Sequence, residues 1–273
     1  MTLTTYEELE QGTPEWLAAR AGIITASVVG QLITKGSPDA LAVDCPRCQA
    51  AAEESCISTA RKVPTPIKTV HDERSSRASE LPPVYKPAVT DTSRALTMTL
   101  TAERITGFVE QIHENADMLR GTLDEPYARE VYNDNIHDVT ELGFMVRDDF
   151  GFRLGYSPDG LVGDDGLIEI KSRKQKKQLA TILADAVPHE NMAQLQCGLL
   201  VSGRDWIDYV SYCGGMPLFV KRVYPDPKWF TAIIEAGEAF EAASAQMVER
   251  YTEATAGLPQ TERIDHFAEM EIF

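Results

Sequence analysis

The sequence predicts a mixed α/β domain, because blocks of helical and strand-like pattern follow one another along its 273 residues. Helical patterns fill the first half, short apolar strand-like runs lie in the middle, and helices return toward the end. Hydrophobic residues make up 43% of the chain, which is enough for a sizeable core. We therefore expect a mixed central sheet flanked by helices.

Capping signals place the first two helices. Thr13 and Pro14 are typical of the N-cap and the first position of a helix, and Gly22 is expected to end it. A second short helix is expected directly afterwards, capped by Thr25 or Ser27.

Apolar periodicity places the remaining elements. Helices are predicted over residues 91–107, 114–132, 176–186, 192–200 and 227–254. A kink or restart is expected at Pro126. Strands are predicted over residues 142–147, 152–156, 166–171, 206–212 and 218–224. The last helix is amphipathic, and its expected buried stripe consists of Phe230, Ile233, Ile234, Phe240 and Met247.

One predicted hairpin carries chemically active side chains. Pro158-Asp159-Gly160 is a turn signal, so the chain is expected to fold Asp159 back toward Glu169. Side chains two apart on a strand share a face, so Glu169 and Lys171 point the same way while Ile170 points into the core. Two carboxylates and an ammonium group at one place suit a divalent cation and a lysine that acts on water or phosphate. A solvated surface turn is the alternative interpretation.

The formal net charge of −16 does not exclude a nucleic-acid partner, because net charge does not describe the local field. Residues 171–177 carry five positive charges beside the predicted cation site, whereas acids are concentrated over 227–254 and 261–273. A basic groove on an acidic body is compatible with phosphate contacts, and a solvated basic loop is the alternative. The sequence shows neither a membrane span nor a signal peptide, so we expect a cytoplasmic protein without a membrane partner.

Five stretches of the chain stand out together: Gly12–Ser27, Gly121–Glu125, Ser157–Gly160, Glu169–Lys171 and Met192–Gln196. In this order they resemble the motifs of the viral recombinase exonucleases, a family that includes the lambda-type exonuclease and the YqaJ proteins. The third and fourth stretches are similar to the PD-(D/E)xK core of this nuclease superfamily. The resemblance covers residues 6–35 and 95–250, and it implies a restriction-endonuclease-like fold for the α/β domain.

The resemblance implies a role for each matched residue. Mg²⁺ or Mn²⁺, with two ions in each site, would be held by Asp159, Glu169, Glu125 and the backbone carbonyl of Ile170. Lys171 would orient or deprotonate the attacking water and offset charge in the transition state. A pocket for a terminal 5′-phosphate would be formed by Arg20, Ser27, Ser157 and Gln194.

The activity that the resemblance implies is 5′→3′ digestion of one strand of linear double-stranded DNA. This reaction leaves a 3′ single-stranded overhang for phage-type homologous recombination by strand annealing. The resemblance also implies a homo-oligomeric ring, a single-strand annealing protein as partner, and a bacterial host. Two alternatives stay open: a PD-(D/E)xK endonuclease of the restriction or repair type, and a catalytically inactive DNA-binding scaffold.

Residues 36–90 depart from the lambda-type pattern, and this stretch is too long for a bare loop, so we predict an insertion. The spacing of four residues in it could close a structural zinc site: Cys45, Cys48, Cys56 and His71. Arg74 fits small zinc modules of phage and actinobacterial proteins, which this segment resembles. Asp44 or Asp72 could replace His71.

A reduced loop without metal, and an iron–sulfur nuclease, are the alternatives to zinc. Cys197 and Cys213 stand apart and are predicted to be buried thiols. The chain is thus predicted to be one exonuclease domain over residues 1–255, interrupted by the insertion over 36–90 and followed by an acidic tail over 256–273.

Overall fold

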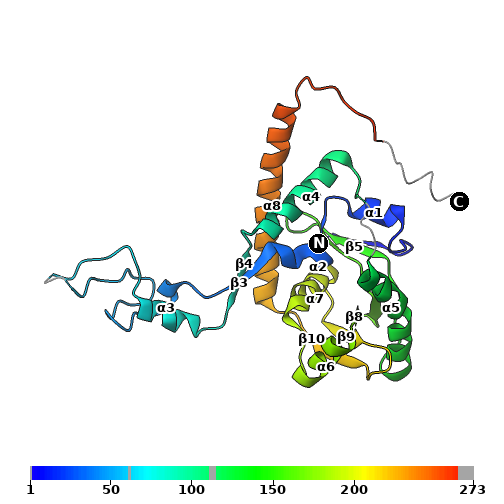
Figure 1. Cartoon of the computed structure of the whole chain (residues 1–273), viewed down its shortest axis with the longest axis horizontal. Coiled ribbons are helices and arrows are strands. Elements are labelled where there is room, and N and C mark those ends of the chain that lie inside the picture. Colours follow the sequence, from blue (N-terminus) through cyan, green and yellow to red (C-terminus); the bar gives the residue numbers. More distant parts are fainter. Residues whose placement is uncertain (1, 61–62, 111–114, 264–273) are drawn as a thin grey trace.

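The computed structural model describes residues 2–60, 63–110 and 115–263 (Figure 1). Its α-helices are α1 (Pro14–Arg20), α2 (Ala26–Val29), α3 (Asp72–Ser79), α4 (Asp91–Thr106), α5 (Ala116–Asn135), α6 (Gln175–Ala184), α7 (His189–Ser202) and α8 (Pro227–Ala254). Its strands are β1 (Leu3–Tyr6), β2 (Ile24–Thr25), β3 (Ile33–Gly36), β4 (Val84–Pro87), β5 (Phe144–Arg147), β6 (Leu154–Tyr156), β7 (Gly160–Val162), β8 (Gly166–Ser172), β9 (Trp206–Tyr212) and β10 (Phe219–Val223). Short 3-10 helices lie at Gly30–Leu32 and Ala40–Ala42.

The strands form two four-stranded sheets and a two-stranded ladder. The first sheet has the order β10-β9-β8-β7, and the second has the order β1-β5-β6-β2. In the first sheet β8 and β9 run parallel, whereas β7 and β10 are antiparallel to their neighbours. In the second sheet only β2 and β6 are parallel. The predicted α/β fold with a mixed sheet flanked by helices is therefore confirmed, and the second sheet is an addition that the sequence did not predict.

Helix α7 forms the centre of the core, because it packs on strands of both sheets and on helices α2 and α8. Residues on nearly every side of it are buried, from Asn191 to Val201. Gly198 lets the ring of Tyr156 lie directly against the helix, since a Cβ at this glycine would come within 2.8 Å of Tyr156 Cζ. Helices α6 and α7 form the crossover that the parallel pair β8–β9 requires.

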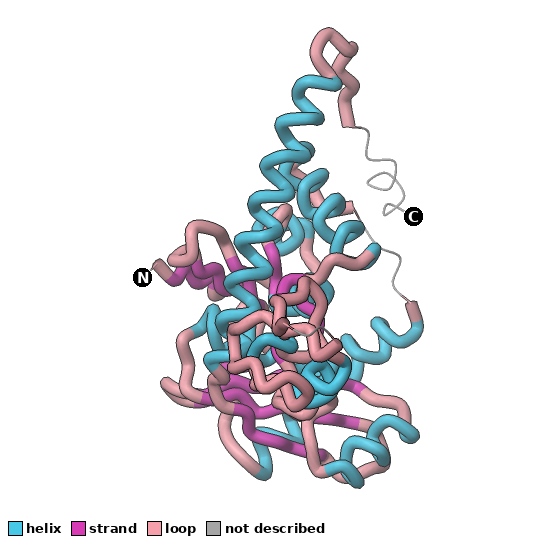
Figure 2. The backbone as a smooth tube through the Cα atoms, turned by 90° about the vertical axis from the view of Figure 1, so that its left-hand side faces the viewer, coloured by secondary structure: helices cyan, strands magenta, loops and turns pink. Residues whose placement is uncertain are grey.

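Helix α8 covers the core and, in Figure 2, extends beyond the sheets. Its buried residues are Trp229, Ala232, Ile233, Ala236, Gly237, Phe240 and Ser244. These include Ile233 and Phe240 of the predicted stripe. Phe230 and Ile234 are partly buried and pack against the core, whereas Met247 is only partly buried. Trp229 belongs to the core because Tyr85 of β4 stacks on it, with ring centroids 3.9 Å apart.

The helix starts follow most of the predicted capping signals. Thr13 caps α1, and Pro14 is its first residue. Helix α2 begins after Thr25, so Ser27 lies inside the helix and is not its cap. Helix α5 continues through Pro126, while the predicted start of this helix falls outside the described residues. Within the described part of the chain, no helix has both the length and the hydropathy of a membrane span.

The cysteine-containing segment forms an arm that projects from the body (Figure 1). β3 and β4 pair antiparallel at its base, with Ile33 opposite Pro87 and Gly36 opposite Val84. The chain therefore leaves the body and returns to it at adjacent points, so the arm, residues 37–83, leaves the packing of the body undisturbed. Helix α3 packs on the 3-10 helix Ala40–Ala42 within the arm.

We expect Leu199→Ala to lower the free energy of unfolding by about 2–5 kcal/mol, because Leu199 of α7 is buried and its truncation leaves a cavity. Leu183→Ala in α6 is the matched control, since Leu183 is 76% exposed. The control should change the free energy of unfolding by less than about 0.5 kcal/mol. Urea denaturation measures the free energy of unfolding of both variants. An equal decrease in both would contradict the central place of α7 in the core.

Candidate active site and zinc cluster

A cavity of about 320 Å³ contains the residues that the sequence singled out. It lies where helices α1, α2, α5 and α7 meet strands β2, β5, β6 and β8. All nine residues expected in the nuclease site, the eight metal or phosphate ligands and the catalytic lysine, line it: Arg20, Ser27, Glu125, Ser157, Asp159, Glu169, Ile170, Lys171 and Gln194. Segments that are distant in the sequence therefore converge on a single site.

The hairpin of β7 and β8 places the first carboxylates of this cavity. Its strands pair antiparallel, and the pairing brings the turn residue Asp159 beside β8. Asp159 Oδ2 accepts a hydrogen bond from the backbone N–H of Ile170 at 2.6 Å. Lys171 Nζ lies 2.6 Å from Glu169 Oε1. Two carboxylates and an ammonium group thus lie side by side, as the sequence predicts.

Three side chains hold the buried carboxylate of Glu169. The hydroxyl of Tyr156 donates to Oε2 at 3.1 Å, while Lys171 and Gln194 both donate to Oε1. Gln194, expected in the phosphate pocket, therefore contacts a carboxylate of the cation site. The sequence analysis did not identify Tyr156, and its position directly before Ser157 is the local signal that could have done so.

Arg129 connects the carboxylate on α5 to the hairpin. It forms an ion pair with Glu125, one helical turn before it, and its Nε donates to the backbone carbonyl of Asp159 at 3.0 Å. A further contact joins Arg129 Nη1 to Glu141 Oε1 at 3.1 Å. Arg129 therefore sets the position of Glu125 relative to Asp159. The sequence analysis did not identify it, because the bond to Asp159 exists only in the folded chain.

The crowded carboxylates change each other's protonation. Burial and the neighbouring Glu169 raise the pKa of Asp159 well above its usual value. Burial also raises the pKa of Glu125, although Arg129 opposes this shift. Burial alone would lower the pKa of Lys171, but Glu169 and Asp159 raise it on balance, so the lysine keeps its charge. A divalent cation would relieve the repulsion, and carboxylate and carbonyl oxygens are the donors that Mg²⁺ and Mn²⁺ prefer.

Another part of the cavity carries a guanidinium group and hydroxyls. Arg20 Nη2 lies 3.0 Å from Thr25 Oγ1 and 3.4 Å from Ser27 Oγ. The guanidinium stacks on the ring of Trp16, 4.1 Å from its centroid, and Trp16 Nε1 donates to Ser157 Oγ at 2.9 Å. We call Trp16, Arg20, Thr25, Ser27 and Ser157 the Arg20 pocket. Its forked N–H donors and hydroxyls suit the oxygens of a phosphate.

The positive charges that follow the hairpin are partly neutralised by local partners. Lys174 pairs with Asp117 at 2.8 Å, and Lys177 pairs with Glu190 at 2.6 Å. Arg173 donates to two neutral groups, a side-chain amide oxygen and a tyrosine hydroxyl. The positive field beside the cavity is therefore weaker than the charge count of residues 171–177 indicates.

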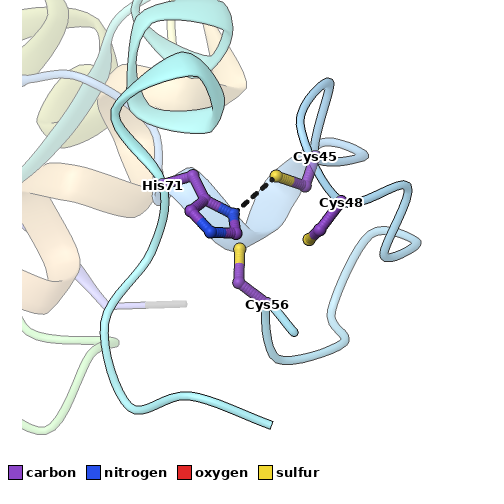
Figure 3. A group of neighbouring side chains, drawn as sticks. All are labelled: Cys45, Cys48, Cys56 and His71. Atoms are coloured by element: carbon purple, nitrogen blue, oxygen red, sulfur yellow. Dashed lines mark hydrogen bonds between the residues drawn. The ribbon is translucent and has the colours of Figure 1, made fainter. Parts of the chain in front are cut away.

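Three cysteines and one histidine of the arm face one another (Figure 3). The sulfur atoms of Cys45, Cys48 and Cys56 and a ring nitrogen of His71 all lie within 4.8 Å of one another. Cys45 Sγ is 3.3 Å from His71 Nδ1. This is the set that the spacing predicted, and three thiolates with one imidazole form a donor set typical of structural zinc sites.

The protonation of Cys48 suits a metal ligand. Burial opposes ionisation, yet hydrogen bonds from the backbone N–H groups of Ile57 and Ala50 lower the pKa of Cys48 to about 6. The thiolate is the form that binds zinc. The alternative ligands Asp44 and Asp72 lie outside the four-residue group.

Arg74 holds the loops of the arm around this group. It is fully buried, and its guanidinium contacts Cys56 Sγ at 3.4 Å. It also donates to four backbone carbonyls, those of Leu41, Val43, Ala51 and Glu54. A buried charge requires such hydrogen-bond partners. The role of Arg74 in holding the loops therefore explains why an arginine belongs to the pattern of small zinc modules that this segment resembles.

Comparisons with known protein families match both parts of the chain. The model of the YqaJ-like viral recombinase domain matches residues 71–205. The model of a family described as "Putative DNA-binding phage zinc finger domain" matches residues 12–91. None of the curated proteins matches this chain.

Solved structures of an alkaline exonuclease, LHK-Exo from Laribacter hongkongensis, are similar to most of this chain. The match has 27% sequence identity and a TM-score of 0.64, and it covers 90% of this chain and 100% of that chain. The structure of LHK-Exo in complex with dAMP matches with the same values. A phage-related exonuclease from Haemophilus somnus 129PT shares 13% identity at a TM-score of 0.47, with 84% of this chain and 96% of that chain covered.

We expect the purified protein to carry one zinc ion and Cys56→Ser to lose it, because three remaining ligands do not close a structural site. Cys213→Ser is the matched control, since Cys213 lies directly after β9 and is buried in the body. Mass spectrometry of the metal content measures all three proteins. A wild-type protein without zinc, or full zinc in Cys56→Ser, would contradict the assignment.

We expect Asp159→Asn to raise the melting temperature of the metal-free protein by about 2–4 °C at neutral pH. Folding raises the pKa of Asp159, so its contribution to stability is lost as the pH rises through the folded-state pKa. The gain from asparagine should therefore shrink as the pH falls from the folded-state pKa toward the usual pKa of aspartate, and it should vanish below that value. Asp164→Asn, in the exposed turn between β7 and β8, is the control for the change in net charge.

The same melting experiment with added Mg²⁺ tests the cation site. Mg²⁺ should raise the melting temperature of the wild type and of Asp164→Asn, because an ion that binds only the folded state stabilises it. It should have little effect on Asp159→Asn. An equal Mg²⁺ response in all three proteins would show that the ion binds elsewhere.

Proposed function

We propose that this protein is a metal-dependent exonuclease that digests one strand of linear duplex DNA from 5′ to 3′, because the model of the YqaJ-like viral recombinase domain matches residues 71–205. The observation that carries the proposal is the cavity in which three carboxylates and Lys171 meet the Arg20 pocket. An exonuclease that starts at a 5′-phosphate has to bind this phosphate and a cleavable phosphodiester together, and the cavity has groups suited to both. The similar fold of an alkaline exonuclease supports the reaction class.

The residues of the cation site would have different roles in the reaction. Asp159, Glu169, Glu125 and the carbonyl of Ile170 would hold one or two Mg²⁺ or Mn²⁺ ions, which supply Lewis-acid stabilisation of the attacking and leaving oxygens. Burial lowers the pKa of Lys171, but the adjacent carboxylates raise it on balance. Lys171 would orient or deprotonate the attacking water and offset charge on the phosphate.

The Arg20 pocket would bind the terminal 5′-phosphate. Its guanidinium can donate two parallel hydrogen bonds to phosphate oxygens, and the hydroxyls of Ser27 and Ser157 can donate to the others. Gln194 lines the same cavity and is bonded to Glu169, so it would link the phosphate to the cation site. The complex of LHK-Exo with dAMP, a nucleoside monophosphate, supports this role.

The zinc arm would contact duplex DNA outside the cavity. This part of the proposal is supported by the description of the matched phage zinc finger family and by the projection of the arm from the body. The family resemblance further supports a 3′ single-stranded product, a ring of several copies around that product, and a single-strand annealing protein as partner. In this proposal the protein prepares DNA ends for recombination by strand annealing.

Digestion of an end-labelled linear duplex in Mg²⁺ tests the function. We expect release of nucleotides from the 5′ end, faster from a 5′-phosphate than from a 5′-hydroxyl, and no cleavage of a closed circle. Lys171→Ala should lower the rate by about 100-fold or more, because it removes a charge at the reacting phosphate, and it should preserve DNA binding. Lys176→Ala, an exposed lysine at the start of α6, is the matched control and should retain activity.

Each alternative function has its own outcome in this experiment. Efficient cutting of the closed circle would identify an endonuclease and overturn the exonuclease proposal. DNA binding by the wild type without any cleavage would identify an inactive scaffold. Undiminished activity of Lys171→Ala would refute the role of that lysine while leaving the exonuclease reaction in place.

A further inference from the structure

We propose that Glu103 and Arg104 of α4 are positioning residues for the Arg20 pocket and set the preference for a 5′-phosphate over a 5′-hydroxyl. They would act through Gly22, because neither residue lines the cavity. The inference rests on the proposed phosphate-binding role of the pocket.

The pocket depends on the short turn between α1 and β2. Arg20 is the last residue of α1 and Thr25 is the last residue of β2, and the 3.0 Å contact between their side chains spans the turn. Gly22, inside the turn, has a φ of +65°, a left-handed conformation that favours glycine. A shift of this turn would move the guanidinium relative to the hydroxyls on the other side of the pocket.

Helix α4 holds both polar backbone groups of Gly22. Glu103 Oε2 accepts the N–H of Gly22 at 2.8 Å, and Arg104 Nε donates to its carbonyl oxygen at 2.8 Å. A Cβ on Gly22 would lie 2.3 Å from Arg104 Cγ, so the helix and the turn are in direct contact. Two consecutive residues of one helix therefore fix the orientation of this peptide segment.

Helix α8 in turn fixes Arg104. The guanidinium of Arg104 donates to both carboxylate oxygens of Glu241, at 2.7 and 2.6 Å, and lies 4.7 Å from the centroid of the Phe240 ring. A bidentate pair of this kind is specific in direction as well as in distance. The contacts from Glu241 through Arg104 to Gly22 thus transmit the position of α8 to the phosphate pocket.

Glu103 also contributes a charge near the pocket. Burial lowers the pKa of Arg20, and the negative charge of Glu103 opposes this effect. Arg20 stays charged at neutral pH with or without this effect, so the contact of Glu103 with the N–H of Gly22, and not its charge, carries the positioning role. Replacement by glutamine would remove this charge but keep an oxygen that accepts the N–H of Gly22.

Equilibrium binding without Mg²⁺ or Mn²⁺ tests the inference, since it needs no cleavage. The probe is a short fluorescent duplex with either a 5′-phosphate or a 5′-hydroxyl, and the readout is the ratio of the two affinities by anisotropy. We expect Glu103→Ala and Arg104→Ala to lower this ratio by about five- to tenfold. Each variant loses one hydrogen bond to Gly22, and the resulting shift of the turn weakens the contact of Arg20 with the phosphate by about the free energy of one hydrogen bond. Glu103→Gln should retain most of the preference.

Arg94→Ala is the matched control on the same helix, because the exposed Arg94 pairs with Asp91 and lies away from Gly22. It should keep the wild-type ratio. Lower melting temperatures of Glu103→Ala and Arg104→Ala with an unchanged ratio would show a merely structural role and overturn the proposal. A wild type that does not discriminate the two ends would overturn the phosphate pocket and this inference with it.

The exonuclease reaction is judged separately from this inference. A wild type that prefers the 5′-phosphate but cleaves no duplex would overturn the proposed reaction. The affinity ratios of the variants would still show whether Glu103 and Arg104 position the Arg20 pocket, because these ratios are measured without catalysis.

Discussion

The close contact between Gly198 of α7 and the ring of Tyr156 is the constraint on which the site depends. A Cβ at this glycine would come within 2.8 Å of the ring, so only glycine lets the helix and β6 approach this closely. At this distance the hydroxyl of Tyr156 reaches one oxygen of Glu169, and Gln194 on the same helix reaches the other. One helix-to-strand spacing therefore fixes both oxygens of the buried carboxylate at the centre of the cation site.

The charged groups of the site act at short range, although the chain as a whole is strongly acidic. The whole chain carries a net charge of −16, which repels DNA at a distance, but salt screens such repulsion beyond about 8 Å under physiological conditions. Within the cavity the electrostatic field on a bound phosphate depends on the nearest charged groups. Lys171 and Arg129 lie against the carboxylates, and Arg20 lies among hydroxyls and the Trp16 ring. An acidic surface is thus compatible with a phosphate site, because binding depends on contacts of a few ångströms.

The parts of the fold that could be predicted from the sequence are those encoded by neighbouring residues. The capped start of α1, the hairpin that joins Asp159 to Glu169, and the Cys45–Cys48 knuckle each follow from local spacing. Tyr156, Arg129 and Arg104 could not be identified, because their partners lie far away in the chain. The same holds for the second sheet, whose outer strands come from the N-terminal region and pair with β5 and β6. A local pattern indicates which residues can react, but the residues that position them depend on packing.

The body and the arm are stabilised by different kinds of interaction. The body has a core of large aliphatic and aromatic side chains around α7, whereas the buried apolar cluster in the described part of the arm comprises Cys45, Ala50 and Cys56 with a few partly buried neighbours. So small a cluster cannot offset the conformational entropy of ordering a segment of this length. The metal ligands and Arg74 therefore have to supply what the core lacks. Since β3 and β4 join the arm to the body through paired strands, we expect removal of zinc from this cluster to disorder the arm and to leave the packing around the cavity intact.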